Sequence, residues 1–260
     1  MIYLLSEEGQ AALKSTASRP TLYAFDFDGT LAAISSDRGA VTLSPCVHAA
    51  LAELAKRVPC AVISGRALGD LAPRINDAVP HLIGNHGLES PLTPPDVLRQ
   101  AERICREWMG QVEKDLTEPL KVIGVEVENK RYTLTFHYRR AGEAAGIRPM
   151  LVSFLDRLIP PPRCLFGKVS VNLLPPGIPG KGEAALALMR HLRQSGLFFI
   201  GDDKTDEDVF ALKEGLVIGV HVGWDAESRA RYCVKRQEET EGIIRLLVEY
   251  TDGAPEPGTS

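Results

Sequence analysis

The sequence lacks any apolar run long enough to cross a membrane. Its longest apolar runs, such as Leu197 to Gly201 and Gly215 to Val222, are far shorter than the roughly 20 residues that a membrane-spanning helix needs. It also lacks an excess of basic charge, because 30 lysines and arginines stand against 34 aspartates and glutamates, for a net charge of -4. We therefore expect neither a membrane protein nor a protein that binds nucleic acid.

The cysteines lack the spacing of a disulfide framework or a zinc site. There are five, an odd number, and no pair is arranged as C-x-x-C, so we expect them to be small buried side chains without a chemical role. A secretory signal is lacking too, because the apolar residues Met1 to Leu5 are followed at once by Glu7 and Glu8, with no positive flank and no cleavage site. We therefore expect a cytoplasmic protein.

The composition that is present is that of an ordinary globular chain. Hydrophobic residues make up 44% and charged residues 25% of the 260 residues, which excludes a disordered chain and a disulfide-stabilised mini-protein. This length suffices for one large or two small domains.

Strands and helices alternate at both ends of the chain. Near the amino terminus we expect strands at 23–27 and 60–63 and helices at 44–57 and 67–75. Near the carboxyl terminus we expect helices at 182–193 and 207–213 and strands at 197–200 and 216–220. Uninterrupted apolar strands that alternate with helices predict a parallel sheet covered by helices on both faces. We therefore predict an α/β fold, with one Rossmann-like sheet built from both ends of the chain and ligands at the carboxyl ends of its strands.

The middle of the chain has a different order of elements. The pattern predicts a helix at 95–114, strands at 122–128 and 132–138, a helix at 146–158, and strands at 163–166 and 169–174. This αββαββ order indicates an α+β cap domain inserted into the core. We place the cap at residues 90–175 and the core at 1–89 and 176–260.

Two groups of acidic residues follow apolar strands. Asp26 and Asp28 lie two residues apart on an extended segment, so both side chains point to one site, although a lone D-x-D is more often a solvated turn. The run from Gly201 to Asp208 adds five acids within eight residues, and the helix dipole accounts for those at its end but not for Asp202 and Asp203. If one sheet holds both segments, a divalent metal site is the simplest explanation, and such oxygen ligands suit Mg²⁺.

A hydroxyl group and two cationic side chains also lie at the ends of predicted strands and helices of the core. Ser64-Gly65-Arg66 supplies a hydroxyl, a backbone amide and a cation after a strand, as a phosphoryl oxygen requires, although Ser-Gly alone is merely a turn. Lys181 opens a helix, where its charge opposes the helix dipole, and this indicates an anionic partner unless the lysine is simply exposed in a glycine turn.

These segments together resemble the four motifs of the haloacid-dehalogenase-like phosphohydrolases, in order: Asp26-Phe27-Asp28-Gly29-Thr30-Leu31, Ser64, Lys181 and Gly201-Asp202-Asp203. Three further stretches resemble the trehalose-6-phosphate phosphatases: Gly84 to Glu89, Glu128-Asn129-Lys130 with His137-Tyr138-Arg139, and Gly167-Lys168 through Asn172 to Pro175. The resemblance implies a Rossmann-like core with a mobile cap between the second and third motifs.

The resemblance also implies a mechanism. Asp26 would attack phosphorus and form an aspartyl-phosphate, and Asp28 would donate a proton to the leaving sugar and later take one from water. Mg²⁺ would be held by Asp26, the backbone carbonyl of Asp28 and Asp202. The supporting residues would be Asp203 and Asp206 beside the metal, and Ser64 and Lys181 on the phosphoryl group.

Substrate contacts are implied as well. Around the phosphate we expect Thr30 and Gly65, and on either the phosphate or the sugar we expect Arg66, Asn85 and His86. In the cap, the residues implied to contact the sugar are Glu128, Lys130, Arg139, Lys168 and Asn172. A solvated hairpin face is the alternative for the first three, and Asn172 stands where the family usually has glutamate, which changes the charge of that contact.

The prediction is thus a Mg²⁺-dependent, monomeric phosphatase whose only partner is a small sugar phosphate, trehalose 6-phosphate. Three alternatives stay open: a phosphatase for another sugar, such as sucrose phosphate or mannosyl-phosphoglycerate; a phosphomutase; and a binding module in which a strand-end aspartate accepts phosphate as a switch. The second acid, Asp28, favours a phosphatase over the dehalogenases of the superfamily, since a halide leaves without a proton.

Overall fold

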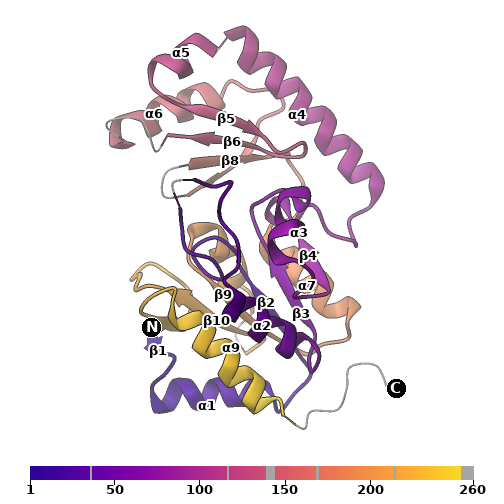
Figure 1. The fold of residues 1–260 in the computed structure, drawn as a ribbon. Helices are drawn as coiled ribbons and strands as arrows, with labels where there is room; N and C mark the ends of the chain where they lie inside the picture. The colour runs from indigo at the N-terminus through magenta and orange to yellow at the C-terminus, as the bar shows by residue number, and fades with distance from the viewer. Residues whose placement is uncertain (36, 116, 139–143, 168–169, 214, 253–260) are drawn as a thin grey trace. The chain divides into compact units, whose positions relative to one another are not determined.

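The computed structural model describes the chain apart from residues 36, 116, 139–143, 168–169, 214 and 253–260, and it divides into two compact units (Figure 1). The core unit comprises Met1–Leu92 and Pro179–Ser260, and the cap unit comprises Thr93–Ile178. No helix among the described residues is long and apolar enough to cross a membrane.

The core unit contains a seven-stranded sheet in which every neighbouring pair is parallel. In spatial order its strands are β1 (Ile2–Tyr3), β11 (Tyr232–Val234), β10 (Val217–Val222), β9 (Gly196–Gly201), β2 (Thr21–Phe25), β3 (Cys60–Ile63) and β4 (His81–Ile83). Because β2 lies between β9 and β3, the two ends of the chain meet in one sheet, as the sequence predicts.

Helices cover both faces of this sheet. Successive residues of β2 alternate between the faces, so Tyr23 and Phe25 enter one core and Leu22 and Ala24 the other. The first face is packed by α1 (Glu7–Thr16), α2 (Pro45–Ala55), α3 (Leu68–Ile75) and α9 (Glu239–Tyr250), and the second by α7 (Lys181–His191) and α8 (Glu207–Phe210). The predicted α/β class is therefore confirmed.

Local signals located several elements well. Ser44 caps α2, since its hydroxyl accepts a hydrogen bond of 3.2 Å from the backbone amide of Val47, and Pro45 occupies the first turn. The helix predicted at 207–213 is shorter than expected, because α8 ends at Phe210. In the core unit, the strands β1, β4 and β11 and the α-helices α1 and α9 are not predicted by the sequence.

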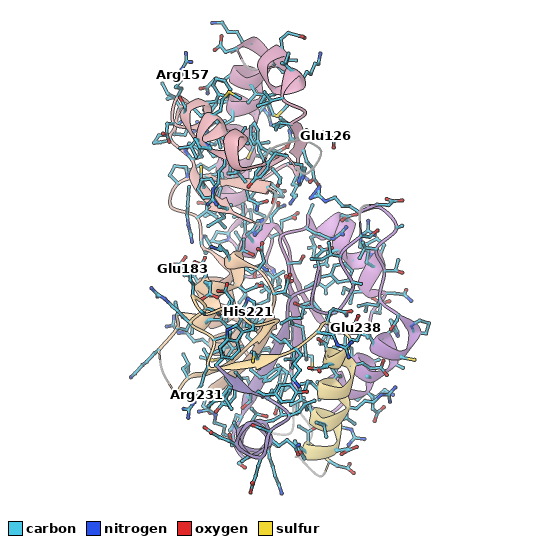
Figure 2. The ribbon with its side chains drawn as sticks, turned by 90° about the vertical axis from the view of Figure 1, so that its left-hand side faces the viewer. Glu126, Arg157, Glu183, His221, Arg231 and Glu238 are labelled. Carbon is cyan, nitrogen blue, oxygen red and sulfur yellow. The ribbon has the colours of Figure 1, made fainter. Side chains whose placement is uncertain are left out.

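The cap unit holds a four-stranded antiparallel sheet in the order β5-β6-β8-β7. The strands are β5 (Glu126–Asn129), β6 (Leu134–His137), β8 (Ser170–Leu174) and β7 (Arg163–Phe166), and the helices are α4 (Pro95–Asp115), α5 (Thr117–Val122) and α6 (Ala144–Leu155). Apolar side chains of one sheet face, among them Phe136 and Val171, pack with Trp108 of α4. Glu126, at the start of β5, is exposed on the surface of this unit (Figure 2).

One predicted strand of the cap is wrong in its first half. The apolar residues Val122 and Ile123 suggest that a strand starts at 122, but Val122 ends helix α5. Gly124 then adopts φ 70°, a conformation that glycine takes readily and that ends the helix. The strand therefore begins only at Glu126.

Candidate active site

Four charged side chains meet at the carboxyl edge of the core sheet. Asp26 follows β2, Asp202 follows β9, and Asp206 ends the short helical turn η2 (Lys204–Asp206). Lys181, the first residue of α7, donates hydrogen bonds of 2.7 Å to Asp26 and 2.7 Å to Asp206. All four side chains are buried, so the parallel order of β2 and β9 brings together residues that are far apart in the sequence.

Asp206 is held on both of its carboxylate oxygens. Its Oδ1 accepts from Lys181, and its Oδ2 accepts from the backbone amides of Asp202 and Asp203, at 3.0 Å each. The absence of a side chain at Gly201 leaves room for this carboxylate, which a Cβ atom at that position would overlap. Asp206 therefore fixes both Lys181 and the turn that carries Asp202.

Burial and charge alter the acidity of this cluster. Burial raises the pKa of Asp26 well above its usual range, and the neighbouring carboxylates of Asp206 and Asp202 add to the increase, while Lys181 opposes it. For Lys181, burial disfavours the ammonium, but Asp206 and Asp26 outweigh that effect and raise its pKa above the usual range. The lysine is thus a fixed positive charge beside a carboxyl group that another cation would keep ionised.

The carboxylates of Asp26, Asp202 and Asp206 have oxygen atoms within 4.8 Å of one another, close enough to hold a metal ion. Three carboxylates face a single ammonium in this group of four side chains, so a divalent cation would balance the remaining charge. The available donors are all oxygen atoms, which suits a hard cation. The residues present therefore fit a divalent metal, and Asp206 lies among the possible ligands.

The turn after β2 is shaped to the cluster. Gly29 has φ 82°, and a Cβ atom there would overlap the carboxylate of Asp202. Next to it, the Thr30 side chain is buried, and its hydroxyl has no hydrogen-bond partner among the described residues. A buried hydroxyl of this kind is available to a ligand, since burial without a partner costs free energy.

Asp28 lies apart from this group of carboxylates. Its carboxylate accepts two hydrogen bonds from Arg66, of 2.7 Å and 2.6 Å, and Arg66 also donates to Asp70 at 2.7 Å. The sequence therefore predicts correctly that Asp28 and Arg66 lie at the same edge, but it does not reveal that they form an ion pair.

Ser64 and the segment Asn85–Gly87 form a second wall of the edge. The Ser64 side chain is buried, its hydroxyl accepts from the backbone amide of Arg66 at 3.2 Å, and its carbonyl accepts from the amide of His86. Asn85 and His86 both have positive φ, of 47° and 58°, which non-glycine residues rarely adopt. The Asn85 amide donates to Glu89 at 2.6 Å, and the His86 ring lies where a Cβ atom of Gly65 would be.

Two of the predicted sugar contacts of the cap unit, Glu128 and Asn172, lie on the polar face of its sheet. Glu128 and Asn172 flank Thr135 in the register of β5, β6 and β8, so their side chains share the face opposite the apolar one. Glu128 contacts the Nε2 atom of His137 at 2.8 Å, and Asn172 accepts from the Thr135 hydroxyl at 2.8 Å. Lys130 follows β5 directly, and two further predicted contacts, Arg139 and Lys168, lie outside the described residues.

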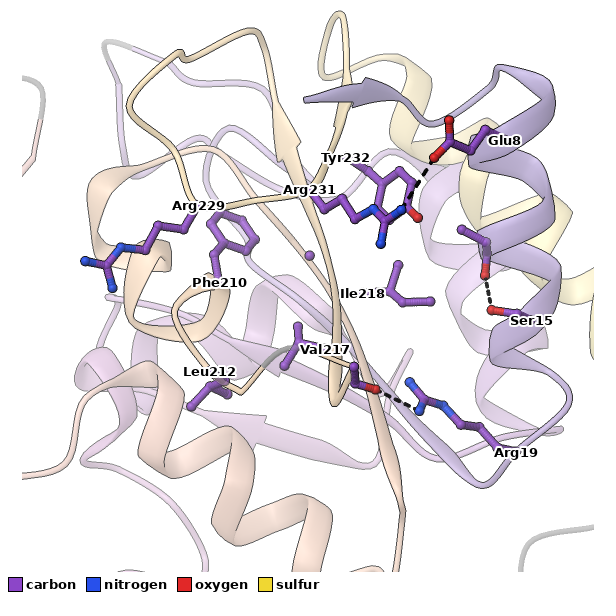
Figure 3. Close-up of a pocket in the computed structure, with 13 residues that line it drawn as sticks. Glu8, Ser15, Arg19, Phe210, Leu212, Val217, Ile218, Arg229, Arg231 and Tyr232 are labelled. Atoms are coloured by element: carbon purple, nitrogen blue, oxygen red, sulfur yellow. Dashed lines mark hydrogen bonds and ion pairs between the residues drawn. The ribbon is translucent and has the colours of Figure 1, made fainter.

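A separate pocket of about 860 Å³ opens in the core unit between α1, β10 and the segment before β11 (Figure 3). Its charged side chains are largely engaged with other protein groups, since Arg231 contacts Glu8 at 3.5 Å and Arg19 donates to the carbonyl of Gly215. Arg19 precedes β2 and Val217 begins β10, so the pocket lies toward the amino ends of these strands. The acid cluster lies at their carboxyl ends and is therefore a different site.

Three residues of these sites were not predicted. Asp70 follows Arg66 by four residues, but Arg66 precedes helix α3, so the spacing of contacts along a helix does not predict this pair. Glu89 accepts from Asn85 and from the backbone amide of Leu68, and His137 pairs with Glu128 across two strands. Neither contact follows from sequence spacing, because each depends on how strands and loops align.

A parallel α/β core with an inserted cap, and with buried aspartates and a lysine at its carboxyl edge, defines a member of the haloacid-dehalogenase-like superfamily. Within it, the trehalose-phosphatase family model matches residues 24–231. The chain therefore belongs to the trehalose-phosphatase family.

Among its relatives, the trehalose-phosphate phosphatase of Mycobacterium tuberculosis (strain H37Rv) is 34% identical over 230 residues, which cover 79% of this chain and 53% of that protein. The trehalose-phosphate phosphatase of Mycobacterium avium is 36% identical over 222 residues, covering 79% of this chain and 55% of that protein. The chain thus spans about half the length of these curated relatives.

Solved structures confirm the fold. The C-terminal domain of Candida albicans trehalose-6-phosphate phosphatase superposes with a TM-score of 0.73 at 21% identity, covering 96% of this chain and 98% of that one. A trehalose-6-phosphate phosphatase related protein superposes with a TM-score of 0.70 at 21% identity, covering 90% of this chain and 100% of that one.

Proposed function

We propose that this protein hydrolyses trehalose 6-phosphate to trehalose and phosphate in the presence of Mg²⁺. The observation that carries the proposal is the buried Asp26, which lies with Lys181, Asp202 and Asp206 at the carboxyl edge of the sheet. Membership of the trehalose-phosphatase family and the names of the curated relatives support the choice of substrate.

Asp26, Asp202 and Asp206 would hold the metal, together with the backbone carbonyl of Asp28. Their oxygen atoms and their excess of negative charge over Lys181 support this role. When bound, Mg²⁺ would neutralise negative charge on the phosphoryl group as it is transferred. Asp203, whose backbone amide is fixed by Asp206, would orient water beside the metal.

The covalent step would use the carboxylate of Asp26. One of its oxygens forms a bond to phosphorus while the bond from phosphorus to the sugar oxygen breaks, and Asp28 gives the departing sugar oxygen a proton. Water then attacks the aspartyl-phosphate, the bond from phosphorus to the Asp26 oxygen breaks, and Asp28 accepts a proton from the water. Both residues return to their initial protonation states, and phosphate is released.

Phosphate oxygens would be held by Lys181, Ser64 and Thr30. Lys181 supplies a fixed positive charge, and the unpaired buried hydroxyl of Thr30 supports a donor role for it. The backbone amide of Gly65 would contribute a further donor, and Asn85 and His86 complete that side of the edge. The polar face of the cap sheet, with Glu128, Lys130 and Asn172, would contact the sugar, as would Arg139 and Lys168.

Phosphate release tests the proposal directly. Trehalose 6-phosphate, glucose 6-phosphate and sucrose 6-phosphate are compared at equal concentration with Mg²⁺ and then with excess EDTA. We expect turnover that depends on Mg²⁺ and strongly favours the trehalose ester. Preference for another ester would be consistent with the proposed aspartate chemistry but would contradict trehalose 6-phosphate as the substrate. Phosphate release that persists in EDTA would contradict the proposed dependence on Mg²⁺.

The matched variant is Asp26→Asn, which keeps the size of the side chain and removes the nucleophile. We expect it to abolish turnover while the protein stays folded, which circular dichroism checks. Activity that persists in this variant would contradict the role of Asp26.

A further inference from the structure

We propose that Arg66 is a positioning residue that fixes the carboxylate of Asp28 for proton transfer, and that Asp70 holds Arg66 in place. The resemblance suggests instead that Arg66 reaches the phosphate or the sugar. The inference rests on the proposed function, because it gives Arg66 a task in the same reaction.

Two hydrogen bonds define the relationship between Arg66 and Asp28. Arg66 Nε donates to Asp28 Oδ2 at 2.7 Å, and Arg66 Nη2 donates to Asp28 Oδ1 at 2.6 Å. This paired arrangement fixes the plane of the carboxylate as well as its distance. Because the Asp28 side chain is 39% exposed, little else among its surroundings would prevent it from turning toward solvent.

The remaining nitrogen of Arg66 is engaged away from Asp28. Arg66 Nη1 donates to Asp70 Oδ2 at 2.7 Å and to the carbonyl of Arg38 at 3.2 Å. The guanidinium also lies over the ring of Phe27, with its central carbon 5.3 Å from the ring centroid. Four of the five N–H donors of Arg66 therefore have protein partners, so most of its hydrogen-bonding capacity is already committed to the protein.

A second arginine extends the same arrangement along helix α3. Arg74 donates to Asp70 Oδ1 at 2.6 Å and to the carbonyls of Gly39 and Val41. Asp70 thus lies between two arginines: Arg74 lies one turn further along α3, and Arg66 precedes the N-cap residue of the helix, Ala67. This row anchors the Arg66 side chain, which is only 11% exposed, without any contribution from a substrate.

The chemical consequence depends on the leaving group. A sugar alkoxide is a strong base and needs a proton from Asp28 as the phosphorus–oxygen bond breaks, whereas p-nitrophenolate is a weak base and leaves without one. Disturbing the position of Asp28 should therefore slow formation of the aspartyl-phosphate from the sugar ester and spare its formation from the aryl ester. The later attack of water is common to both esters and does not enter kcat/KM. A residue needed for phosphate binding or for the fold would affect both esters.

The test compares kcat/KM for trehalose 6-phosphate and for p-nitrophenyl phosphate in Arg66→Gln and Arg66→Lys. We expect the sugar ester to lose about 10- to 100-fold and the aryl ester less than about threefold. Lysine should restore little, because an ammonium cannot make the paired contact. Asp70→Asn leaves Arg66 in place but weakens the contact that holds it. This variant should also slow the sugar ester relative to the aryl ester, by a smaller factor.

A double variant tests whether Arg66 acts through Asp28. Asp28→Asn combined with Arg66→Gln should be no slower on trehalose 6-phosphate than Asp28→Asn alone. The Asp28 carboxylate is already absent in the single variant, so the loss of Arg66, which holds that carboxylate, should have no further effect. Arg57→Gln is the matched control, because Arg57 makes ion pairs elsewhere in the core unit, with Glu53 and Asp252. We expect its ratio of the two rates to equal that of the wild type.

The outcomes separate the two proposals. If the wild type hydrolyses neither ester, the proposed function fails, and this role of Arg66 fails with it. If the wild type hydrolyses both and the Arg66 variants lose both equally, or lose the aryl ester more, Arg66 is a phosphate or structural residue and only this inference is overturned. Should Arg66→Gln not fold, Arg66→Lys and Asp70→Asn still decide the question by the same ratio.

Discussion

Lys181 donates a hydrogen bond of 2.7 Å to Asp206, and both side chains are almost completely withdrawn from solvent, with exposed fractions of 3% and 0%. The same ammonium lies 2.7 Å from Asp26, so it joins a strand from the amino-terminal part of the chain to a turn from the carboxyl-terminal part. A buried charge is tolerated only where it has partners, and here each group depends on the others.

Replacing this lysine by alanine is expected to destabilise the protein strongly. Lys181→Ala would leave Asp26 and Asp206 buried without their cation, at a cost of about 3–5 kcal/mol in the free energy of unfolding. Urea unfolding without metal measures it, and Lys56→Ala is the control, since its pair with Glu53 is exposed and should be worth less than about 1 kcal/mol. If Lys181→Ala and Lys56→Ala were equally stable, the buried contacts of Lys181 would not stabilise the fold as expected.

A methyl group at Gly29 is expected to disturb the acid cluster. Gly29→Ala combines an unfavourable positive φ with overlap of the Asp202 carboxylate, so we expect loss of both stability and phosphate release. Gly223→Ala is the matched control, because Gly223 has φ 89° and nothing within 4 Å of the added carbon. If the two variants behave alike, the close approach of Asp202 has no importance.

The Asp70 carboxylate is expected to make stability depend on pH. Its burial alone would raise the pKa, but hydrogen bonds from Arg74 and Arg66 outweigh this and lower the pKa below the usual value for an aspartate. Asp70 therefore stabilises the fold fully above the usual pKa, and this contribution disappears as the pH falls through the lowered pKa. Urea midpoints of wild type and Asp70→Asn should differ most near neutral pH and converge in acid, and a difference that grows in acid would refute this.

The thiols are expected to differ in reactivity according to their burial. Cys46 is exposed and Cys164 half-buried, whereas Cys60, Cys105 and Cys233 are buried. Burial raises the pKa of Cys105 to about 12 and that of Cys164 to about 11, which suppresses the reactive thiolate. A colorimetric thiol reagent at pH 8 should modify Cys46 rapidly in the native protein and all five after unfolding; rapid modification of three or more native thiols would contradict these positions.

Elements with strong local signals were predictable from the sequence. The apolar run Cys60–Ile63 is a strand with the predicted bounds, because four successive buried side chains suit a strand covered on both faces. The two-residue strand Ile2–Tyr3 was not predictable, since it exists only through pairing with Tyr232 and Cys233. Val122 was misassigned because its apolar character favours a strand, whereas its position in α5 depends on the turn at Gly124.

The candidate site was predictable as a set of residues but not as a set of contacts. Strand ends indicate that Asp26 and Asp202 approach each other, because parallel strands end at one edge. The partner of each charge is set by side-chain geometry instead, and so Asp28 pairs with Arg66 while Asp206 takes a place beside Asp26.

The position of β2 between β3 and β9 determines when the site can form. Asp26 leaves the ribosome early, but both Lys181 and Asp206 follow only after the entire cap unit has been synthesised. An emerging chain therefore carries an unneutralised aspartate whose counterion does not yet exist, and the central strand lacks one neighbour. Asp26 and Lys181 are 155 residues apart, so a large loop must close before the acid cluster can form, and we expect this cluster to be among the later contacts of the core.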